Sequence, residues 1–444
     1  MTSRYLELAP SNKSTDNKYA FKNGFAALNF DIPEGNFVLD PSSVRIVGDL
    51  VCFKDSAETA LVNGDTLALN QKLGVLGLFN QLIWRSSKHQ TIISHERNYN
   101  RWCSSYLSNS QSVEDSLSWG SQTHLSLPNA ELQKRTTMTG DTLKSFCTHL
   151  PCGLLNAGQS IPLTSNTLGG LSLSIMLESD AQGLQVLPNY APNTDPNIAA
   201  FLGSFYQLQN VRLICSVITP PPDQLSQLLR QTQGALTYQS VHSYYDTSNS
   251  NNMQVSMNFG LSKVKSLFVS MIPSDKLNSL AADGFATLMP CNATGIPADI
   301  QKISFLRGGT IFPKLFPRDT NYKENTTTIV PDPVIANDYL NSVSNILTNR
   351  NTMGGLINNN RKWISKATGL FGVPYQLVAN GGVWWGIGVN YTNFLGGTGI
   401  NLNKEQWGLN IECALTDSNA QSLFMFVNAQ TQIIWTQSGV QILQ

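Results

Sequence analysis

The 444-residue sequence carries little charge. Only 13% of its residues are Asp, Glu, Lys or Arg, well below the usual quarter, and the 29 basic and 29 acidic residues cancel. No run of lysines and arginines occurs, so the chain lacks a basic arm that could neutralise nucleic acid phosphates. The sequence predicts no direct sequence-specific nucleic acid binding. Its neutral polar surface is typical of faces that pack against other protein copies.

Long apolar runs are also missing. No stretch of 18 apolar residues occurs, and the opening MTSRYLELAPSNKST has no apolar core, so we expect neither a transmembrane segment nor a secretory signal. The seven cysteines are odd in number and scattered, and none forms a CxxC pair. Cys215 and Cys413 lie inside apolar runs. The cysteines are therefore predicted to be reduced thiols of a protein made in a reducing compartment.

Catalytic motifs are absent as well. The five histidines make no HExxH or comparable metal spacing, and neither GxSxG nor a phosphate-binding P-loop occurs. The pair Gly386 and Gly388 lacks the third glycine and the following helix of a dinucleotide fingerprint. We nominate no catalytic, cofactor-binding or metal-binding residue and expect no enzyme activity. Trp384 and Trp385 could stack on a sugar or base, but an interface anchor is favoured.

A central stretch, Gly74 to Leu107, combines two kinds of periodicity. Residues 78–84 are apolar on both parities, which predicts a strand covered on both faces. A polar break at Ser86 to Gln90 and β-branched residues from Thr91 then predict a hairpin. After the hairpin, apolar side chains recur at helical spacing, at Tyr99, Trp102, Cys103, Tyr106 and Leu107. We expect a buried hairpin followed by a short amphipathic helix.

Other segments of the first half also read as strands. A turn at Asp40 to Ser43 is expected before a strand over residues 44–53. Clean alternation predicts a strand over Leu171–Leu177, and Tyr206 to Ile218 is apolar on one face. The prolines at 220–222 cannot donate to a sheet and mark the best domain boundary.

The second half repeats this order. It has an opening strand from Leu236 to Tyr245, a doubly apolar strand from Val264 to Ile272, an alternating strand from Trp407 and closing strands up to Trp435. We expect an all-β chain of two consecutive eight-stranded jelly rolls with short flanking helices. The expected domains are an N-terminal arm (1–27), a first jelly roll (28–222), a linker (223–233) and a second jelly roll (234–444) with a long insertion at about 312–375.

Taken together, these segments resemble the double jelly-roll major capsid proteins of viruses. The first half of the resemblance lies in FVLDPSSVRIVGDLVCF, GVLGLFNQLIWRSSKHQTIISHERNYNRW, FCTHLPCGLLNAGQSIPLTSNTLGGLSLSIMLESD and YQLQNVRLICSVI. The second half lies in VKSLFVSMI, ISFLRGGTIFPKLFP and VIANDYLNSVSNIL. The chain is most similar to the capsid proteins of polinton-like viruses and virophages. Adenovirus hexon and the capsid proteins of large DNA viruses and membrane-containing tailless phages are more distant.

The resemblance covers most of the chain from about Phe37 and rests on order and spacing. It implies an architectural protein in which three chains, each with two upright jelly rolls, form a pseudo-hexagonal capsomer of an icosahedral DNA virus shell. The implied partners are the chain itself as a homotrimer, neighbouring capsomers, and penton and minor capsid proteins. The implied location is the virion. Because the chain is short for the family, long outward-facing towers are not expected.

Two alternatives remain. A carbohydrate-binding or hydrolytic β-sandwich would use Trp384 and Trp385 as a stacking platform. The other alternative is a penton or minor capsid protein, although such proteins usually carry one jelly roll and the repeated order here favours two. Within the insertion, a helix is expected from Val334 to Leu347. By resemblance, this interval would pack against a neighbouring subunit of the trimer and form its outward-facing top.

Overall fold

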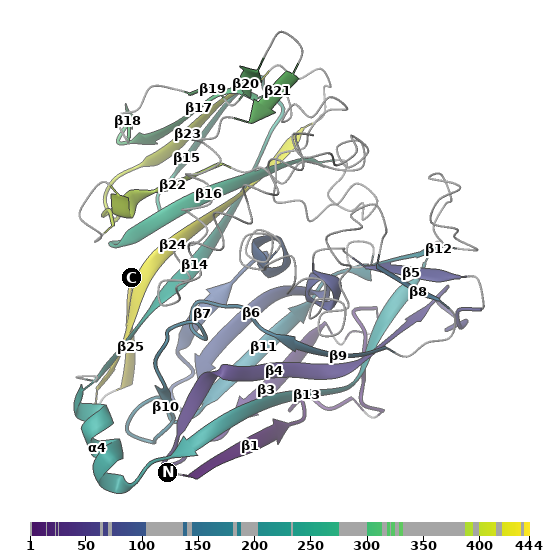
Figure 1. Ribbon diagram of the computed structural model, residues 1–444, viewed down its shortest axis with the longest axis vertical. Helices are drawn as coiled ribbons and strands as arrows, with labels where there is room; N and C mark the ends of the chain where they lie inside the picture. Colours follow the sequence, from purple (N-terminus) through teal and green to yellow (C-terminus); the bar gives the residue numbers. More distant parts are fainter. Residues whose placement is uncertain are drawn as a thin grey trace. The chain divides into compact units, whose positions relative to one another are not determined.

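The computed structural model is composed mainly of β-strands and divides into two compact units (Figure 1). The first unit comprises Met1–Asn100, Glu114–Ser240 and Thr431–Leu443, and the second comprises Arg101–Val113, Val241–Gln430 and Gln444. The structure describes residues 2–103, 136–139, 144–180, 184–187, 203–231, 234–274, 300–312, 318–331, 387–393, 399–413, 420–436 and 439–444, with short gaps at residues 15, 23, 25, 63–64, 70–72, 320 and 325–327.

Two sheets dominate the first unit (Figure 1). One has the order β1-β13-β4-β10, with β2 also paired to β13 and β9 to β4; the other has the order β3-β11-β6-β7. Their bounds are β1 Thr2–Leu8, β2 Lys18–Tyr19, β3 Ala27–Ile32, β4 Val38–Phe53, β6 Phe79–Ser86, β7 Ile92–Glu96, β9 Lys144–His149, β10 Ile161–Pro162, β11 Leu171–Leu177 and β13 Phe205–Thr219.

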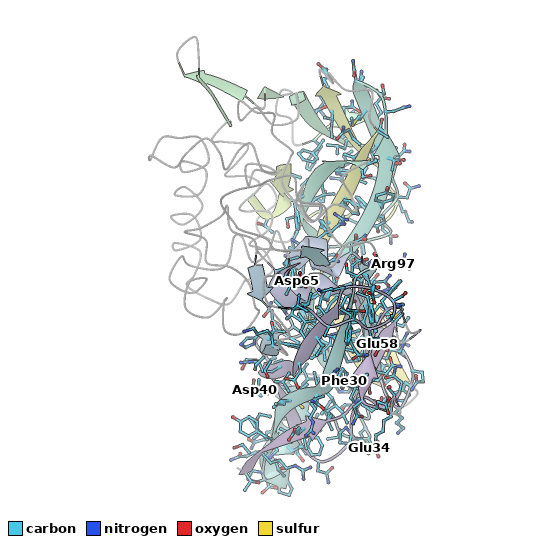
Figure 2. All side chains as sticks on the ribbon, turned by 90° about the vertical axis from the view of Figure 1, so that its right-hand side faces the viewer. Phe30, Glu34, Asp40, Glu58, Asp65 and Arg97 are labelled. Atoms are coloured by element: carbon cyan, nitrogen blue, oxygen red, sulfur yellow. The ribbon has the colours of Figure 1, made fainter. Side chains whose placement is uncertain are left out.

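The inner faces of these two sheets form the core of the first unit. The predicted alternation of β11 is confirmed, because Leu171, Leu173, Ile175 and Leu177 are buried while the residues between them are half-buried. The predicted buried face of β13 is confirmed in the same way. Phe30 of β3, labelled in Figure 2, is fully buried among these apolar side chains. Period-two patterning thus sets which face of each sheet turns inward.

The second half of the chain repeats the strand order of the first half. Its sheets have the orders β14-β24-β16-β22, with β25 paired to β24, and β15-β23-β17-β18, with β19 paired to β17. Their bounds are β14 Ala235–Ser248, β15 Asn252–Met257, β16 Val264–Pro273, β17 Ile300–Arg307, β18 Thr310–Ile311, β19 Arg318–Asp319, β22 Ile387–Asn390, β23 Trp407–Cys413, β24 Gln421–Thr436 and β25 Gly439–Leu443. The division between the units falls inside β14 and β24.

When the principal strands of each half are ranked from one to eight along the chain, both halves give the sheet orders 1-8-3-6 and 2-7-4-5. Two four-stranded sheets of eight strands connected in this way make a jelly roll. The prediction of two consecutive jelly rolls is therefore confirmed. The ranking corrects one expectation. The doubly apolar segment from Val264 was matched to the segment from Leu78, which becomes β6, the fourth strand of the first roll. It is the third strand of its own roll and corresponds to β4.

A single apolar cluster fills the second unit. It includes Met253 and Val255 of β15, Trp407 and Leu409 of β23, and buried residues of β16, β22 and β24. The Trp407 ring contacts Phe259 and Phe305, with ring centroids 5.3 Å and 5.9 Å apart, and its indole N–H donates to the Tyr391 hydroxyl at 2.9 Å. The two sheets are thus joined by an aromatic core whose buried polar atoms are bonded.

The predicted turn at Asp40 to Ser43 is wrong, because β4 runs through it. Arg45 pairs with Ile214 and Asp40 with Ser216, so residues 41–44 bulge opposite Cys215 alone. The Ser43 hydroxyl donates to the Asp40 carbonyl at 2.6 Å and accepts from the Ser216 amide at 2.7 Å. These bonds replace the ladder that Pro41 cannot join, so the strand continues past a proline.

The central stretch differs from its prediction in two respects. Its first residues, Gly74–Leu78, form a 3-10 helix, and the strand β6 that follows is buried on one face only, with Ile83 half-buried on the other. The hairpin is confirmed, since β6 pairs antiparallel with β7. Residues 99–103 are helical. Tyr99, Trp102 and Cys103 are buried as expected, but so are Asn100 and Arg101, and Tyr106 and Leu107 lie outside the described residues.

Three expected segments contain more structure than predicted. The arm, 1–27, contains β1 and β2, and all seven residues of β1 pair with β13. The linker region holds α4, Pro222–Gln231. Residues 108–140 are rich in Ser, Asn and Thr, which predicts a long surface loop. They include β8 (Thr136–Thr139), which joins β5 (Thr66–Leu69) and β12 (Leu184–Leu187) in a small sheet. The exact domain boundaries stay predictions.

The interval 312–375, the expected insertion, has no clear strand pattern in its sequence. It contains β19 and a hairpin of β20 (Asn321–Glu324) and β21 (Thr328–Pro331). The expected helix from Val334 to Leu347 lies outside the described residues.

Candidate functional site

The described histidines do not form a catalytic arrangement with one another. His89 lies in the β6–β7 turn, His95 Nε2 lies 3.0 Å from Gln81 Oε1, and burial lowers the pKa of His242 to about 4. In the described ranges, no group of three or more His, Cys, Asp or Glu side chains could hold a metal ion. Trp384, Trp385 and His124 lie outside those ranges.

The glycine pair at 386 and 388 leads into a strand. β22 pairs antiparallel with β16, and Gly388 lies opposite Phe268. A dinucleotide fingerprint opens a helix at this point, whereas Ile387–Asn390 form a strand.

A buried polar cluster surrounds Glu178 at the end of β11. One carboxylate oxygen of Glu178 accepts from the side-chain amides of Asn80 and Asn100, each at 2.8 Å. The other accepts from the Ser179 amide at 2.9 Å, and the Tyr206 hydroxyl donates to the Glu178 carbonyl at 2.6 Å. The cluster ties β6, β11, β13 and the helical segment at Asn100 together. Because its oxygens are occupied by structural donors, we assign it a structural role.

The cysteines that the structure describes fit the prediction of free thiols. Cys52, Cys103, Cys152 and Cys215 are buried and unbridged, and Cys147 is exposed and unbridged. Burial raises the pKa of Cys52 well above the usual thiol value and that of Cys215 to about 11. The Cys52 and Cys215 thiols are therefore poor nucleophiles.

The β1 edge, Thr2–Leu8, is largely exposed, and only Leu6 and Leu8 are half-buried. Among the described strands, β1 is paired only on its β13 side. The Tyr5 side chain is 78% exposed, the highest value among the large apolar residues described. Beside it, Glu7 forms an exposed ion pair with Arg212, and a hollow of about 120 Å³ between β1 and β2 is lined by Glu7, Ala9, Pro10, Asn17, Tyr19, Asn210, Val211 and Arg212.

The β1 edge carries only part of the usual protection against pairing with another chain. Arg4 and Glu7 are charged, but Thr2–Leu8 contains no proline or lysine, and its register with β13 has no bulge. Sequence reasoning missed this edge because the polar residues that follow it suggested an arm. The signal present was the alternation of Leu6 and Leu8, which are half-buried, with exposed neighbours.

Other large apolar residues are exposed singly. In the second unit, Tyr245 is 49% exposed, yet its ring contacts Phe424 at 5.0 Å and its hydroxyl lies 3.1 Å from that of Ser422. Ile311 of β18 is partly exposed as well. Of the helices in the described residues, none is both long enough and apolar enough to cross a membrane.

Comparison with known proteins found similarity in structure alone. No protein-family model and no curated protein matches the sequence. A chain of the quasi-atomic PBCV-1 capsid superposes with a TM-score of 0.58 and 10% identity, covering 100% of this chain and 96% of that one. The Faustovirus major capsid protein gives a TM-score of 0.56 and 10% identity, with coverage of 98% and 90%.

A third solved structure is the PBCV-1 protein fitted into a reconstruction of the virophage Sputnik. Its TM-score is 0.54 at 9% identity, with coverage of 100% of this chain and 96% of that one. At such low identity the likeness concerns the fold, and it extends over the whole chain. The polypeptide therefore has the double jelly-roll fold seen in these viral capsid proteins.

Proposed function

We propose that this chain is a major capsid protein and that three copies form a pseudo-hexagonal capsomer of an icosahedral DNA virus shell. The observation that carries the proposal is the repeated strand order 1-8-3-6 and 2-7-4-5. Two rolls in one chain supply six rolls to a trimer, which suits a six-sided building block. The whole-chain likeness to the PBCV-1 and Faustovirus capsid proteins supports the same function.

The surface chemistry supports assembly into extended contacts. Charged residues make up 13% of the chain, so few ionic groups would have to be desolvated between copies. Proposed further partners are neighbouring capsomers and penton and minor capsid proteins, and the proposed location is the virion, after synthesis in a reducing compartment. The interval 312–375 stays our candidate for a contact between subunits on the outward side.

Within the described residues, the β1 edge is our candidate for a contact between copies. A seven-residue edge that is paired only with β13 among the described strands offers backbone donors and acceptors on its other side, and Tyr5 offers a rigid amphipathic ring. Aromatic anchors of this kind are enriched among the residues that dominate interface energies.

The test compares the parent with Tyr5→Asp and with Tyr5→Phe, which keeps the ring. Light scattering at micromolar concentration should give the mass of a trimer for the parent and for Tyr5→Phe, and negative-stain images should show pseudo-hexagonal particles. Tyr5→Asp should weaken the association of chains into trimers, or of trimers into larger assemblies, at least tenfold. It should not lower the thermal unfolding temperature, because the side chain is exposed.

A stable parent monomer would contradict the capsomer. If Tyr5→Asp assembles like the parent, the capsomer can stand but the β1 edge is not a contact. The carbohydrate-binding alternative rests on Trp384 and Trp385, and ligand affinity of a monomer would favour it. A penton or minor capsid protein would not require the second set of eight strands.

A further inference from the structure

Glu96, the last residue of β7, is a carboxyl group inside the first jelly roll. It is 2% exposed and lies opposite Leu82 on the inner face of the sheet. Its Oε1 accepts a hydrogen bond from the Gly153 amide at 3.1 Å. Its Oε2 is buried and has no hydrogen-bond partner among the described residues. A carboxyl group in this position is poorly prepared to carry a charge.

Gly153, whose amide donates to Glu96, lies against the start of β14. A Cβ placed on Gly153 would lie 1.5 Å from the Gln239 carbonyl oxygen, so only glycine allows this approach. One residue earlier in β14, the Tyr238 hydroxyl donates to the Ile93 carbonyl of β7 at 2.5 Å. All of these residues belong to the first unit. β7, the segment at Gly153 and the start of β14 are thus joined around one carboxyl group.

The groups that face Glu96 offer it no positive charge. From β14 the titratable group is the Tyr238 phenol, and from the segment before Gly153 it is the Cys152 thiol; both are buried. On β7 itself, His95 lies on the opposite face with Arg97 beside it in sequence, and β6 contributes Leu82. Burial raises the pKa of Glu96 to about 8, and the Gly153 amide and Ser94 hydroxyl lower it by less.

We propose that Glu96 is a proton-operated latch: in its neutral form it holds Gly153 and the start of β14 against β7, and its ionisation releases them. An ionised Glu96 needs water or further donors at Oε2. Because Oε2 is buried and Gly153 and Tyr238 lie beside the carboxyl group, we expect water to reach it by separating Gly153 from Gln239 or Tyr238 from Ile93. The latch controls the contact of β7 with Gly153 and the start of β14. It goes beyond the proposed capsid function.

The direction of the pH effect follows from the raised pKa. The folded protein binds the Glu96 proton more tightly than the unfolded chain, whose carboxyl has a pKa of about 4.5. The stability that Glu96 contributes is therefore complete below pH 4.5, declines above it and is lost as the pH rises through about 8. Mild acid should tighten the latch, and alkali should open it.

The test measures amide hydrogen exchange of the intact chain by mass spectrometry. Protection of peptides covering 235–240 and 150–156, normalised to the intrinsic exchange rate, is compared at pH 5 and pH 9. The parent should open more readily at pH 9, by up to about three orders of magnitude, since each unit of pKa difference is a tenfold factor. Glu96→Gln should show the same protection at both pH values.

Two controls separate the latch from general effects. Glu34→Gln, which changes an exposed glutamate at the surface of the first unit (Figure 2), should keep the pH dependence of the parent. Tyr238→Phe should lower protection by a similar factor at both pH values, because it removes a contact that does not titrate in this range. The proposal is overturned if Glu96→Gln keeps the pH dependence of the parent, or if the parent shows equal protection at pH 5 and pH 9. Since the readout is local exchange, a failure here leaves the capsid proposal untouched.

Discussion

At the scale of single residues, the first unit depends on a few buried polar groups. Glu178 joins Asn80 and Asn100, which lie 98 and 78 positions away in the sequence. A buried acceptor of this kind fixes the positions of its donors, because an unsatisfied buried donor costs free energy. Apolar packing sets which face of a strand turns inward, and these bonds then fix the exact register of the elements.

Replacing Glu178 tests this role. Glu178→Ala should lower the free energy of unfolding by about 2–4 kcal/mol, because the buried amide of Asn100 and the half-buried amide of Asn80 lose their carboxylate acceptor. Glu34→Ala, on the exposed side of the same unit, should change it by less than about 0.5 kcal/mol. Urea unfolding followed by tryptophan fluorescence would measure both. Equal stability of Glu178→Ala and the parent would show that the cluster is not structural.

Much of the core could be predicted residue by residue, but the polar centres could not. The alternation in Leu171–Leu177 identifies its buried face because period two is a local property. Glu96 lies between His95 and Arg97, and Glu178 lies between Leu177 and Ser179. Only the pairing of distant strands places the two glutamates inside. Nothing within a window of ten residues separates them from surface glutamates such as Glu34 and Glu58.

At the scale of elements, β4 shows how a strand survives a proline. The bulge at residues 41–44 is bridged by the Ser43 hydroxyl, which bonds to the Asp40 carbonyl and the Ser216 amide. The sequence suggested a turn because Asp-Pro-Ser-Ser is typical of turns. Pairing with β13 overrides that local preference. The same long-range pairing makes β1 a strand within the expected arm.

The bulge makes a specific prediction. Ser43→Ala should destabilise the first unit by about 1–2 kcal/mol, because the Ser216 amide loses its acceptor. Ser42→Ala, one position away, removes only the exposed hydrogen bond from the Ser42 hydroxyl to Asp40 and should cost less than about 0.5 kcal/mol. Differential scanning calorimetry of the two variants would compare them. Equal losses would mean that the hydroxyl of Ser43 does not bridge the bulge.

At the scale of the whole molecule, the free thiols report on the integrity of the fold. At pH 7.5, an alkylating reagent should label exposed Cys147 quickly. Cys52 and Cys215 should react only after unfolding, because they are buried and burial raises the pKa of both thiols. Peptide mapping by mass spectrometry gives the rate at each site. Fast labelling of Cys215 in the native state, or a bridge between Cys147 and Cys152, would contradict the structure.

The architecture of the whole chain could be foreseen from the repeated order of its segments, although one equivalence was wrong. The segments from Leu78 and from Val264 are both apolar on two parities. Their composition therefore does not distinguish the fourth strand of one roll from the third strand of the other. Their ranks in the sheets separate them, and rank depends on partners that local patterns do not encode.

The pairing of first with last strand in each roll has a consequence for synthesis. Thr2 pairs with Thr219, so the sheet of β1 cannot close until the ribosome has made the whole first half. β14 likewise waits for β24, which ends at Thr436. Contacts of such long sequence separation form slowly and leave strand edges open meanwhile. The first roll can therefore close its sheets during translation well before the second roll, whose strand edges stay open until β24 has been made.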